Sequence, residues 1–555
     1  MRANLRFGSG AVALALLGVA GSARGGGFEF PDNGTEALGR GGAFVAKADD
    51  PTAMYYNIAG LAQQEGFKLA IDTNLIWHDF AFTSSGFTGG GVSPGTDLTY
   101  GGAWSGAGPI PTMHDSDRLF FAPLAAATFD LGRLSRKLHN LVIGLAVFGP
   151  SAVGSNSYGV GDPSGAPNKN DPNNTCHTAY GAFPTADNTK GVPYTTCDAP
   201  PATVMGADGK PALAPSRYDI SQTNLLIVLP TLGISYRPHK MIDVGFGWQM
   251  VYSTFDVANA NLVGGTDGKS DAYGRVRTSG NSFSSSSSHI GDPNYHFKPG
   301  LGSFGWLFSV LLHPTEWMDI GASYRTPIRI NTEGTLHPVS TTATLPDAVA
   351  TFSTTLPMYL RAGARAVMHY GDGTERADLE FDFVWENWSA EHADHVHAED
   401  LTGANFLWQS GTLDADVLHN YKDTYGARLG GAYNVRLRDD MRLTGRLGMF
   451  YDSAATDPAY TRLDFNTLEK IGLTVGGGFR MKGVTINVAY AYIFSPSRTV
   501  NDSQNYAISA ATGSSIPDDK RVYVGNGVYT GYFHILSVGL AFNFSEFKNP
   551  TLFAH

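Results

Sequence analysis

Residues 484–494 read VTINVAYAYIF. Large apolar side chains occupy nearly every second position, and Thr485, Asn487, Ala489 and Ala491 lie between them. Successive side chains of a β-strand point to opposite faces, so this pattern predicts a strand with one apolar face and one small or polar face. Residues 241–252 (MIDVGFGWQMVY) and 532–544 (YFHILSVGLAFNF) follow the same pattern.

Segments of this kind recur along the chain, and short turns alternate with long polar loops between them. This alternation is typical of outer-membrane β-barrels, which have short periplasmic turns and an even number of strands. We therefore predict an all-β fold, a 14-stranded antiparallel transmembrane β-barrel over residues 65–544. The predicted strands are residues 66–77, 118–129, 140–148, 218–236, 241–257, 297–312, 317–330, 356–370, 377–388, 424–436, 441–451, 471–481, 484–494 and 529–544.

A soluble β-sandwich would show a similar alternation. The membrane barrel is favoured because the apolar faces end in Tyr, Trp and Phe, which are enriched at membrane interfaces. The chain has 555 residues, of which 67 are Gly, 12% are aromatic and only 16% are charged. Its formal net charge of -11 argues against nucleic acid as a partner, because nucleic-acid binding requires basic surface.

The N-terminus has the features of a secretory signal peptide. Arg2 and Arg6 precede a short apolar core at residues 7–20, and Gly21-Ser22-Ala23 supplies small residues for cleavage. We expect residues 1–23 to be the signal peptide and residues 545–555 to form a C-terminal tail. Export together with a membrane barrel predicts a location in the outer membrane of a Gram-negative cell.

Residues 26–62 (GGFEFPDNGTEALGRGGAFVAKADDPTAMYYNIAGLA) show neither a period of two nor one of 3.6. They offer too little apolar surface to offset the chain entropy of a free-standing domain. Another part of the molecule must therefore enclose them, and the lumen of the barrel can do so. We predict that residues 24–64 form an N-terminal plug, or hatch, inside the lumen.

Charged residues occur on the polar faces of two neighbouring predicted strands. Arg361 and Arg365 lie on the first, and Asp378, Glu380 and Asp382 lie on the second. Arginine on the lipid side would cost about 2–4 kcal/mol at mid-membrane, so these side chains are expected to face inward as a lumenal charge network. The network either supports the plug, or forms a polar path beside it, or simply fills the lumen.

Four motifs follow one another near the N-terminus. They are Gly27-Phe28, Leu38-Gly39-Arg40, Ala48-Asp49-Asp50 and Asn57-Ile58-Ala59. In this order they resemble the motifs of the long-chain fatty-acid transporter family of the outer membrane (FadL/TodX type), and the resemblance extends over nearly the whole chain. Ile58 replaces a proline of the family pattern, so the resemblance does not define the conformation of the local turn of the plug.

The resemblance implies a fourteen-stranded barrel closed by an N-terminal hatch. It implies passive transport of fatty acids or aromatic hydrocarbons, which bind apolar loops, pass to an inner pocket and leave through a lateral gap. Gly27, Phe28 and Phe30 are the implied ligand-binding residues. The implied plug-motif residues are Leu38, Gly39, Arg40, Asp49, Asp50, Asn57 and Ala59, among which the Asp pair caps a turn and Asn57 with Ala59 shapes the hatch turn.

Cys176 and Cys197 are expected to form a disulfide in one polar loop of an exported protein. We expect no cofactor and no metal, although three histidines at 392, 395 and 397 lie among carboxylates in one loop. The expected partners are hydrophobic small molecules and outer-membrane lipid, and the expected state is a monomer. Two alternatives remain: a membrane lipid hydrolase, with His534 as its one candidate histidine on the lipid-facing wall, and a structural or adhesive barrel.

Overall fold

The computed structural model describes the following part of the chain. These are residues 31–86, 88–89, 110, 112–115, 119–149, 155–158, 180–181, 192–193, 203–205, 211–213, 216, 219, 222–262, 271–281, 304–339, 348–399, 412–438, 440–465, 467–506, 518 and 521–546. The predicted signal peptide, Gly27, Phe28, Phe30, Cys176, Cys197 and most of the predicted tail lie outside the described residues.

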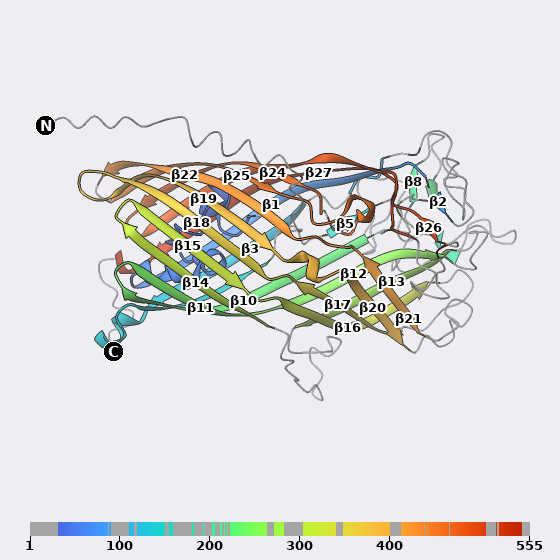
Figure 1. Ribbon diagram of the computed structural model, residues 1–555, viewed down its shortest axis with the longest axis horizontal. Coiled ribbons are helices and arrows are strands. Elements are labelled where there is room, and N and C mark those ends of the chain that lie inside the picture. Colours follow the sequence, from blue (N-terminus) through green and yellow to red (C-terminus); the bar gives the residue numbers. More distant parts are fainter. Residues whose placement is uncertain are drawn as a thin grey trace.

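One antiparallel sheet closes on itself as a barrel (Figure 1). Its first and last strands, β1 and β27, pair from Lys68 opposite Asn543 to Ser84 opposite Gly527. The barrel strands are β1 (Phe67–Ser84), β3 (Leu119–Asp130), β4 (Leu141–Phe148), β5 (Ser155–Ser157), β10 (Gln222–His239), β11 (Ile242–Met250), β12 (Tyr252–Leu262), β13 (Asp271–Asn281), β14 (Phe304–Thr315), β15 (Met318–Arg325), β16 (Ile328–Val339), β17 (Ala348–Leu356), β18 (Tyr359–His369), β19 (Glu375–Glu386), β20 (Ala393–Glu399), β21 (Leu413–Leu418), β22 (Thr424–Arg438), β23 (Met441–Asp452), β24 (Lys470–Met481), β25 (Val484–Val500) and β27 (Gly527–Asn543).

These twenty-one strands amount to fourteen crossings of the wall, because seven consecutive pairs continue one another along the same neighbours. For example, β4 and β5 both pair with β10, one after the other. The other pairs are β11 and β12, β13 and β14, β15 and β16, β17 and β18, β19 and β20, and β21 and β22. The prediction of a 14-stranded antiparallel barrel is confirmed.

The smaller elements are not strands of this wall. They are α1 (Thr35–Gly39), α2 (Ala53–Tyr56), the 3-10 helices η1 (Ile58–Gln63), η2 (Leu131–Arg133), η3 (Arg136–Leu138), η5 (Trp388–Ala390), η6 (Pro458–Tyr460) and η8 (Phe544–Glu546), and the strand pairs β2 (Thr88–Gly89) with β26 (Val522–Tyr523), β6 (Tyr180–Gly181) with β7 (Val192–Pro193), and β8 (Thr203–Met205) with β9 (Pro211–Leu213). None of the described helices is long and apolar enough to span a bilayer.

The alternation seen in the sequence sorts side chains between the two faces of the wall. On β23, Leu443, Leu447 and Met449 are about half or more exposed on the outside, whereas Thr444 and Arg446 are buried on the inside. Large apolar side chains do not remain exposed to water over so wide a surface, so this outer face is the one in contact with lipid.

The wall is longer than the sequence pattern indicates. We predicted polar loops after residues 257, 330 and 388, but much of these segments continues the ladder as β12, β13, β16, β17, β20 and β21. Beyond the bilayer, neither face of a strand needs to be apolar. The strands therefore lose their hydropathy pattern there while their backbone hydrogen bonds continue.

Replacing Leu447 by Arg tests the lipid-facing assignment. Leu447 is 70% exposed and lies halfway along β23, so the substitution should destabilise the folded barrel by about 2–4 kcal/mol. The measurement is equilibrium unfolding from lipid vesicles by urea. Leu437→Arg, close to the end of β22, serves as the control and should cost about 0–1 kcal/mol. Equal, small effects of both variants would contradict the assignment.

Candidate functional site

Residues 31–66, here called the lumenal segment, lie inside the barrel (Figure 1). The helix α1 contacts β1, β23, β24, β25 and β27, and η1 contacts β4, β10, β11 and β14. Val45 lies against Gly321 of β15 and Gly363 of β18. A single segment can touch strands all around a closed ring only from its interior, so this segment occupies the lumen.

Wall glycines let the backbone of the lumenal segment come close to the strands. A Cβ atom built on Gly430 would lie 1.8 Å from the carbonyl oxygen of Arg40, and one on Gly448 would lie 2.2 Å from the carbonyl carbon of Arg40. Gly39 of the segment lies against Gly476 in the same way, with 3.0 Å from its built Cβ to the Cα of Gly476. Any larger residue at Gly430 or Gly448 would displace the segment from the wall.

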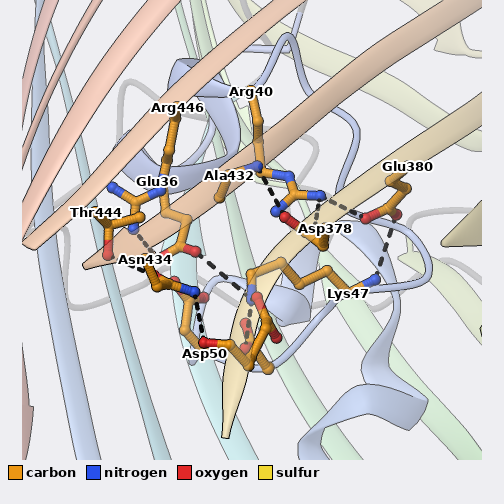
Figure 2. Close-up of polar contacts among 12 residues, drawn as sticks. Glu36, Arg40, Lys47, Asp50, Asp378, Glu380, Ala432, Asn434, Thr444 and Arg446 are labelled. Atoms are coloured by element: carbon orange, nitrogen blue, oxygen red, sulfur yellow. Dashed lines mark hydrogen bonds and ion pairs between the residues drawn. The ribbon is translucent and has the colours of Figure 1, made fainter. Parts of the chain in front are cut away.

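Arg40 is the centre of the polar contacts between the lumenal segment and the wall (Figure 2). Its side chain is fully buried, and its guanidinium lies 2.7 Å from Asp378 and 3.0 Å from Glu380. Its Nε also donates to the carbonyl oxygen of Ala43 at 2.7 Å. A buried cation of this kind is tolerated only with such partners, and removing one partner of a buried ion pair typically costs about 3–5 kcal/mol.

The carboxylates of β19 also bind the backbone of the lumenal segment. Glu380 accepts a hydrogen bond from the amide of Ala46 at 2.6 Å, and Asp382 accepts from the amides of Phe44 and Val45 at 2.8 and 3.0 Å. These amides belong to a stretch without regular secondary structure, so their hydrogen-bond partners come from the wall.

Arg365 and Arg361 lie on β18 beside these acids. Arg365 contacts Asp378 at 2.7 Å and Asp319 at 3.1 Å, and it also pairs with Glu375. Arg361 donates to the carbonyl oxygen of Tyr55 at 2.7 Å and lies 4.3 Å from the centre of its ring. The structure therefore places all five predicted network residues on the lumen side, and four of the five directly bind the lumenal segment.

Asn57 and Ala59 bind each other and the wall. The Asn57 side chain accepts from the amide of Ala59 at 3.1 Å and donates to the carbonyl oxygens of Val45 and Val310 at 2.8 and 3.1 Å. Ile58, which stands where the family pattern has proline, packs against Gly233 and Gly247 of the wall. Leu38 is fully buried in an apolar cluster with Phe450 and Ile535.

The two adjacent aspartates of the lumenal segment, Asp49 and Asp50, have different partners. Asp50 accepts hydrogen bonds from the amide of Thr52 at 2.7 Å and from its hydroxyl at 2.5 Å, which is the geometry of a capped turn. Asp49 pairs with Lys47 at 2.7 Å and is 40% exposed. Burial, with the neighbouring charge of Glu36, raises the pKa of Asp50 to about 7, whereas the Lys47 ammonium lowers the pKa of Asp49 against the effect of burial.

Sequence reasoning missed further ion pairs between the lumenal segment and the wall, among them one made by Glu36. Glu36 of α1 lies 2.8 Å from Arg446 of β23, which also donates to Asn487 of β25 at 3.0 Å. Arg446 and Asn487 lie at inward positions of their alternating strands, which was the available signal. Their partner Glu36 belongs to a segment without a period, so it could not be inferred.

On the side of the lumenal segment that faces the long connections, the inner faces of β4, β10, β12 and β17 are apolar. Phe148, Ile227, Leu229, Phe255 and Phe352 are all buried there and form one continuous cluster with Met54, Tyr55 and Tyr56 of the segment. The ring centres of Phe255 and Phe352 lie 4.2 Å apart with their planes tilted by 32°, and Tyr55 meets Phe148 edge-on at 5.1 Å. We predicted an inner face that is small or polar. This prediction is correct for the lumen near the short turns and wrong for the part of the lumen that this cluster lines.

A second polar cluster lies near the long connections. Arg462 contacts Asp219 at 2.9 Å, and His419 contacts Asp394 at 3.0 Å and Asp464 at 3.5 Å, with all of these side chains at most 10% exposed. Burial disfavours the charged form of His419, but Asp464 and Asp394 raise its pKa overall. The cluster joins residues 219 and 462–464 of two long connections with Asp394 of β20 and with His419 between β21 and β22. Sequence reasoning did not identify it.

Three of the histidines that the sequence singled out bind neighbouring polar groups. His534 lies 2.7 Å from the hydroxyl of Tyr490, and His395 and His397 lie 2.7 and 2.5 Å from Asp416 and Asp414 of β21. Within the described residues, no group of three or more His, Cys, Asp or Glu side chains has the geometry of a metal site.

Solved structures share this fold. The described barrel aligns with a Pseudomonas aeruginosa FadL homologue (TM-score 0.62, 16% identity, 94% of this chain and 100% of that chain). It also aligns with the Ralstonia pickettii toluene transporter TbuX (0.53, 14%, 93% and 100%) and the Pseudomonas putida toluene transporter TodX (0.53, 13%, 94% and 99%). At these identities the likeness shows the fold alone.

No curated protein sequence matches the chain. A family model described as "outer membrane protein transport protein (OMPP1/FadL/TodX)" matches residues 209–527. This is a family of transport proteins of the outer membrane and not of enzymes, so it contradicts the hydrolase alternative. Since the match covers more than half of the sequence, the chain belongs to the OMPP1/FadL/TodX family of outer-membrane transport proteins.

Proposed function

We propose that this protein carries hydrophobic molecules, either long-chain fatty acids or aromatic hydrocarbons, passively through the outer membrane. The observation that carries the proposal is the continuous apolar cluster from Phe255 and Phe352 down to Tyr55 and Met54 of the lumenal segment. A water-filled pore offers a hydrophobic solute no favourable site, whereas an apolar surface inside a barrel does. Transport then follows the concentration gradient.

We further propose that the lumenal segment is a plug that moves during transport. The segment occupies the lumen on the short-turn side of the apolar region. A solute that reaches Tyr55 therefore cannot continue past the segment. The segment is bound by side-chain and backbone contacts to β18, β19 and β23 and has no covalent link there other than its own chain. Breaking these contacts while the barrel remains closed would open a route.

A thin part of the wall is our proposed exit into the membrane. Gly144, Gly233 and Gly247 lie directly opposite one another on β4, β10 and β11. On the inside they meet Met54 and Ile58 of the lumenal segment. On the outside, the same strands carry an apolar groove of about 430 Å³ lined by Ile143, Leu145, Leu232, Ile234, Phe246 and Trp248, among others. Only backbone separates the two apolar regions.

The apolar lining is tested at Ile227. Replacing this buried residue by Asn should weaken binding of a labelled long-chain fatty acid or of toluene about tenfold, because one apolar side chain contributes about 1.5 kcal/mol or more. Binding is measured on the purified protein. Leu226→Asn changes the next residue, which is half exposed on the outer face, and should leave binding unchanged. Equal binding by the wild type and Ile227→Asn contradicts the proposal.

The plug is tested at Arg40. Arg40→Met leaves Asp378 and Glu380 buried without their shared cation, so docking of the lumenal segment should weaken by about 3–5 kcal/mol. Single-channel recordings in planar bilayers should then show larger and more frequent openings. Arg376 is an exposed residue on β19, the strand that carries Asp378 and Glu380, and Arg376→Met should behave as wild type. A correctly folded Arg40→Met barrel with wild-type conductance would refute the role of this contact.

The exit is tested by a reversible staple. Cysteines at Ile143 and Ile234, which are directly opposite on the outer faces of β4 and β10, should form a disulfide that prevents these strands from separating. Uptake should fall severalfold on oxidation and return on reduction. The matched pair Val475 and Tyr490 on β24 and β25 should have no effect. Unchanged uptake through the oxidised 143–234 pair excludes an exit between β4 and β10.

A further inference from the structure

Three arginines lie in a row at the short-turn end of the barrel. Arg442 of β23 is directly opposite Arg436 of β22 on one side and directly opposite Arg480 of β24 on the other. Their sequence neighbours Leu437, Leu443 and Met481 are exposed on the outer face, so the three guanidinium groups point to the lumen side. Directly opposite side chains have Cβ atoms about 4.5–5.5 Å apart, and like charges at this spacing repel.

The three arginines line one cavity of about 770 Å³ at this end of the barrel. Arg438 and Lys482 add two further positive charges to its lining, and the acidic residues of the lining are Glu375, Asp440 and Glu546. Because short turns lie on the periplasmic side of outer-membrane barrels, the cavity opens toward the periplasm. It is separate from the apolar part of the lumen described above.

The two outer arginines of the row have carboxylate partners, and the middle one differs. Arg436 pairs with Asp372, and Arg480 pairs with Glu546. The Nε of Arg442 is buried and makes no hydrogen bond to any described residue. A buried donor without an acceptor is costly, and here it lies between two like charges. Among the described residues, Arg442 is therefore the one arginine of the row without a carboxylate partner.

We propose that Arg442, flanked by Arg436 and Arg480, binds a small oxyanion of the phosphate or carboxylate class from the periplasmic side. The planar guanidinium presents paired donors that match the oxygens of such anions. One bound anion would supply an acceptor for the Nε of Arg442 and reduce the repulsion along the row. This inference does not depend on which hydrophobic molecule the barrel carries.

The site also adjoins the lumenal segment. Arg442 and Arg480 line a second, smaller cavity of about 130 Å³, whose lining includes Glu36, Lys47 and Asp49. Glu36 and Lys47 belong to the ion pairs that attach the segment to the wall. A bound anion therefore lies where its charge acts on those ion pairs.

The test is isothermal titration calorimetry, in which inorganic phosphate is titrated into the purified full-length protein in a non-ionic detergent. The wild type should show saturable binding at one site, and Arg442→Gln should weaken it at least tenfold. Arg442→Lys keeps the charge but loses the paired donors, so it should bind with intermediate strength. Arg136→Gln, in the exposed turn η3 and outside the cavity, should bind as wild type. A heat-modifiability gel verifies folding of each variant.

Two results overturn the proposal: no saturable binding of phosphate or acetate to the wild type, or equal binding by the wild type and Arg442→Gln. If Arg442→Gln does not fold, the comparison of Arg442→Lys with Arg136→Gln decides in the same way. Repeating the titration in phosphatidylglycerol nanodiscs separates the sources of the anion. Weaker phosphate binding there than in detergent identifies a lipid headgroup as the occupant, and equal binding identifies a soluble anion.

Discussion

The structure depends on one constraint, which is that every backbone amide and carbonyl within the bilayer must find a hydrogen-bond partner in the protein. A sheet satisfies this only if its edges meet, and here β1 and β27 pair along almost their whole length. Closure has a second consequence. It creates an interior that is shielded from lipid, and the chain's own residues 31–66 occupy a large part of it.

The interior is divided by chemistry into two parts. Near the short turns it contains buried charges, and Arg40 with Asp378 and Glu380 shows why they are tolerated, since each charge has an opposite partner within about 3 Å. Nearer the long connections, the inner faces of β4, β10, β12 and β17 are apolar, and Tyr55 and Tyr56 lie at the boundary. The charged part holds the lumenal segment in place. The apolar part offers a surface against which a hydrophobic solute can bury its own apolar surface.

This division links the fold to transport. Ion pairs are directional and lose most of their value when one partner is displaced, so the docking of the lumenal segment is well suited to a two-state change. Apolar contact is non-directional and accepts solutes of different shapes. In the proposed transport, the apolar part binds varied hydrophobic molecules, and the lumenal segment is held by a small number of specific contacts.

The alternation within each strand was visible in the sequence because it depends only on neighbouring residues. It predicted the fourteen crossings and the inward direction of Asp378, Glu380 and Asp382. The absence of a period in residues 26–62, together with the family motifs, pointed to residues 24–64 as a candidate plug. The polar extensions such as β13 and β20 were missed, because outside lipid a strand needs no apolar face.

Which inward residues meet was decided by register and closure alone. Arg365 is directly opposite Glu380, yet its ion pair is with Asp378, whereas Glu380 binds Arg40 and the amide of Ala46. Arg40 and Glu380 are 340 residues apart in the chain, and no local pattern connects them. The same holds for the arginine row at Arg442 and for the glycines at Gly233. Strand periodicity is a local property that the sequence by itself determined, whereas contacts across the lumen exist only once the ring has closed.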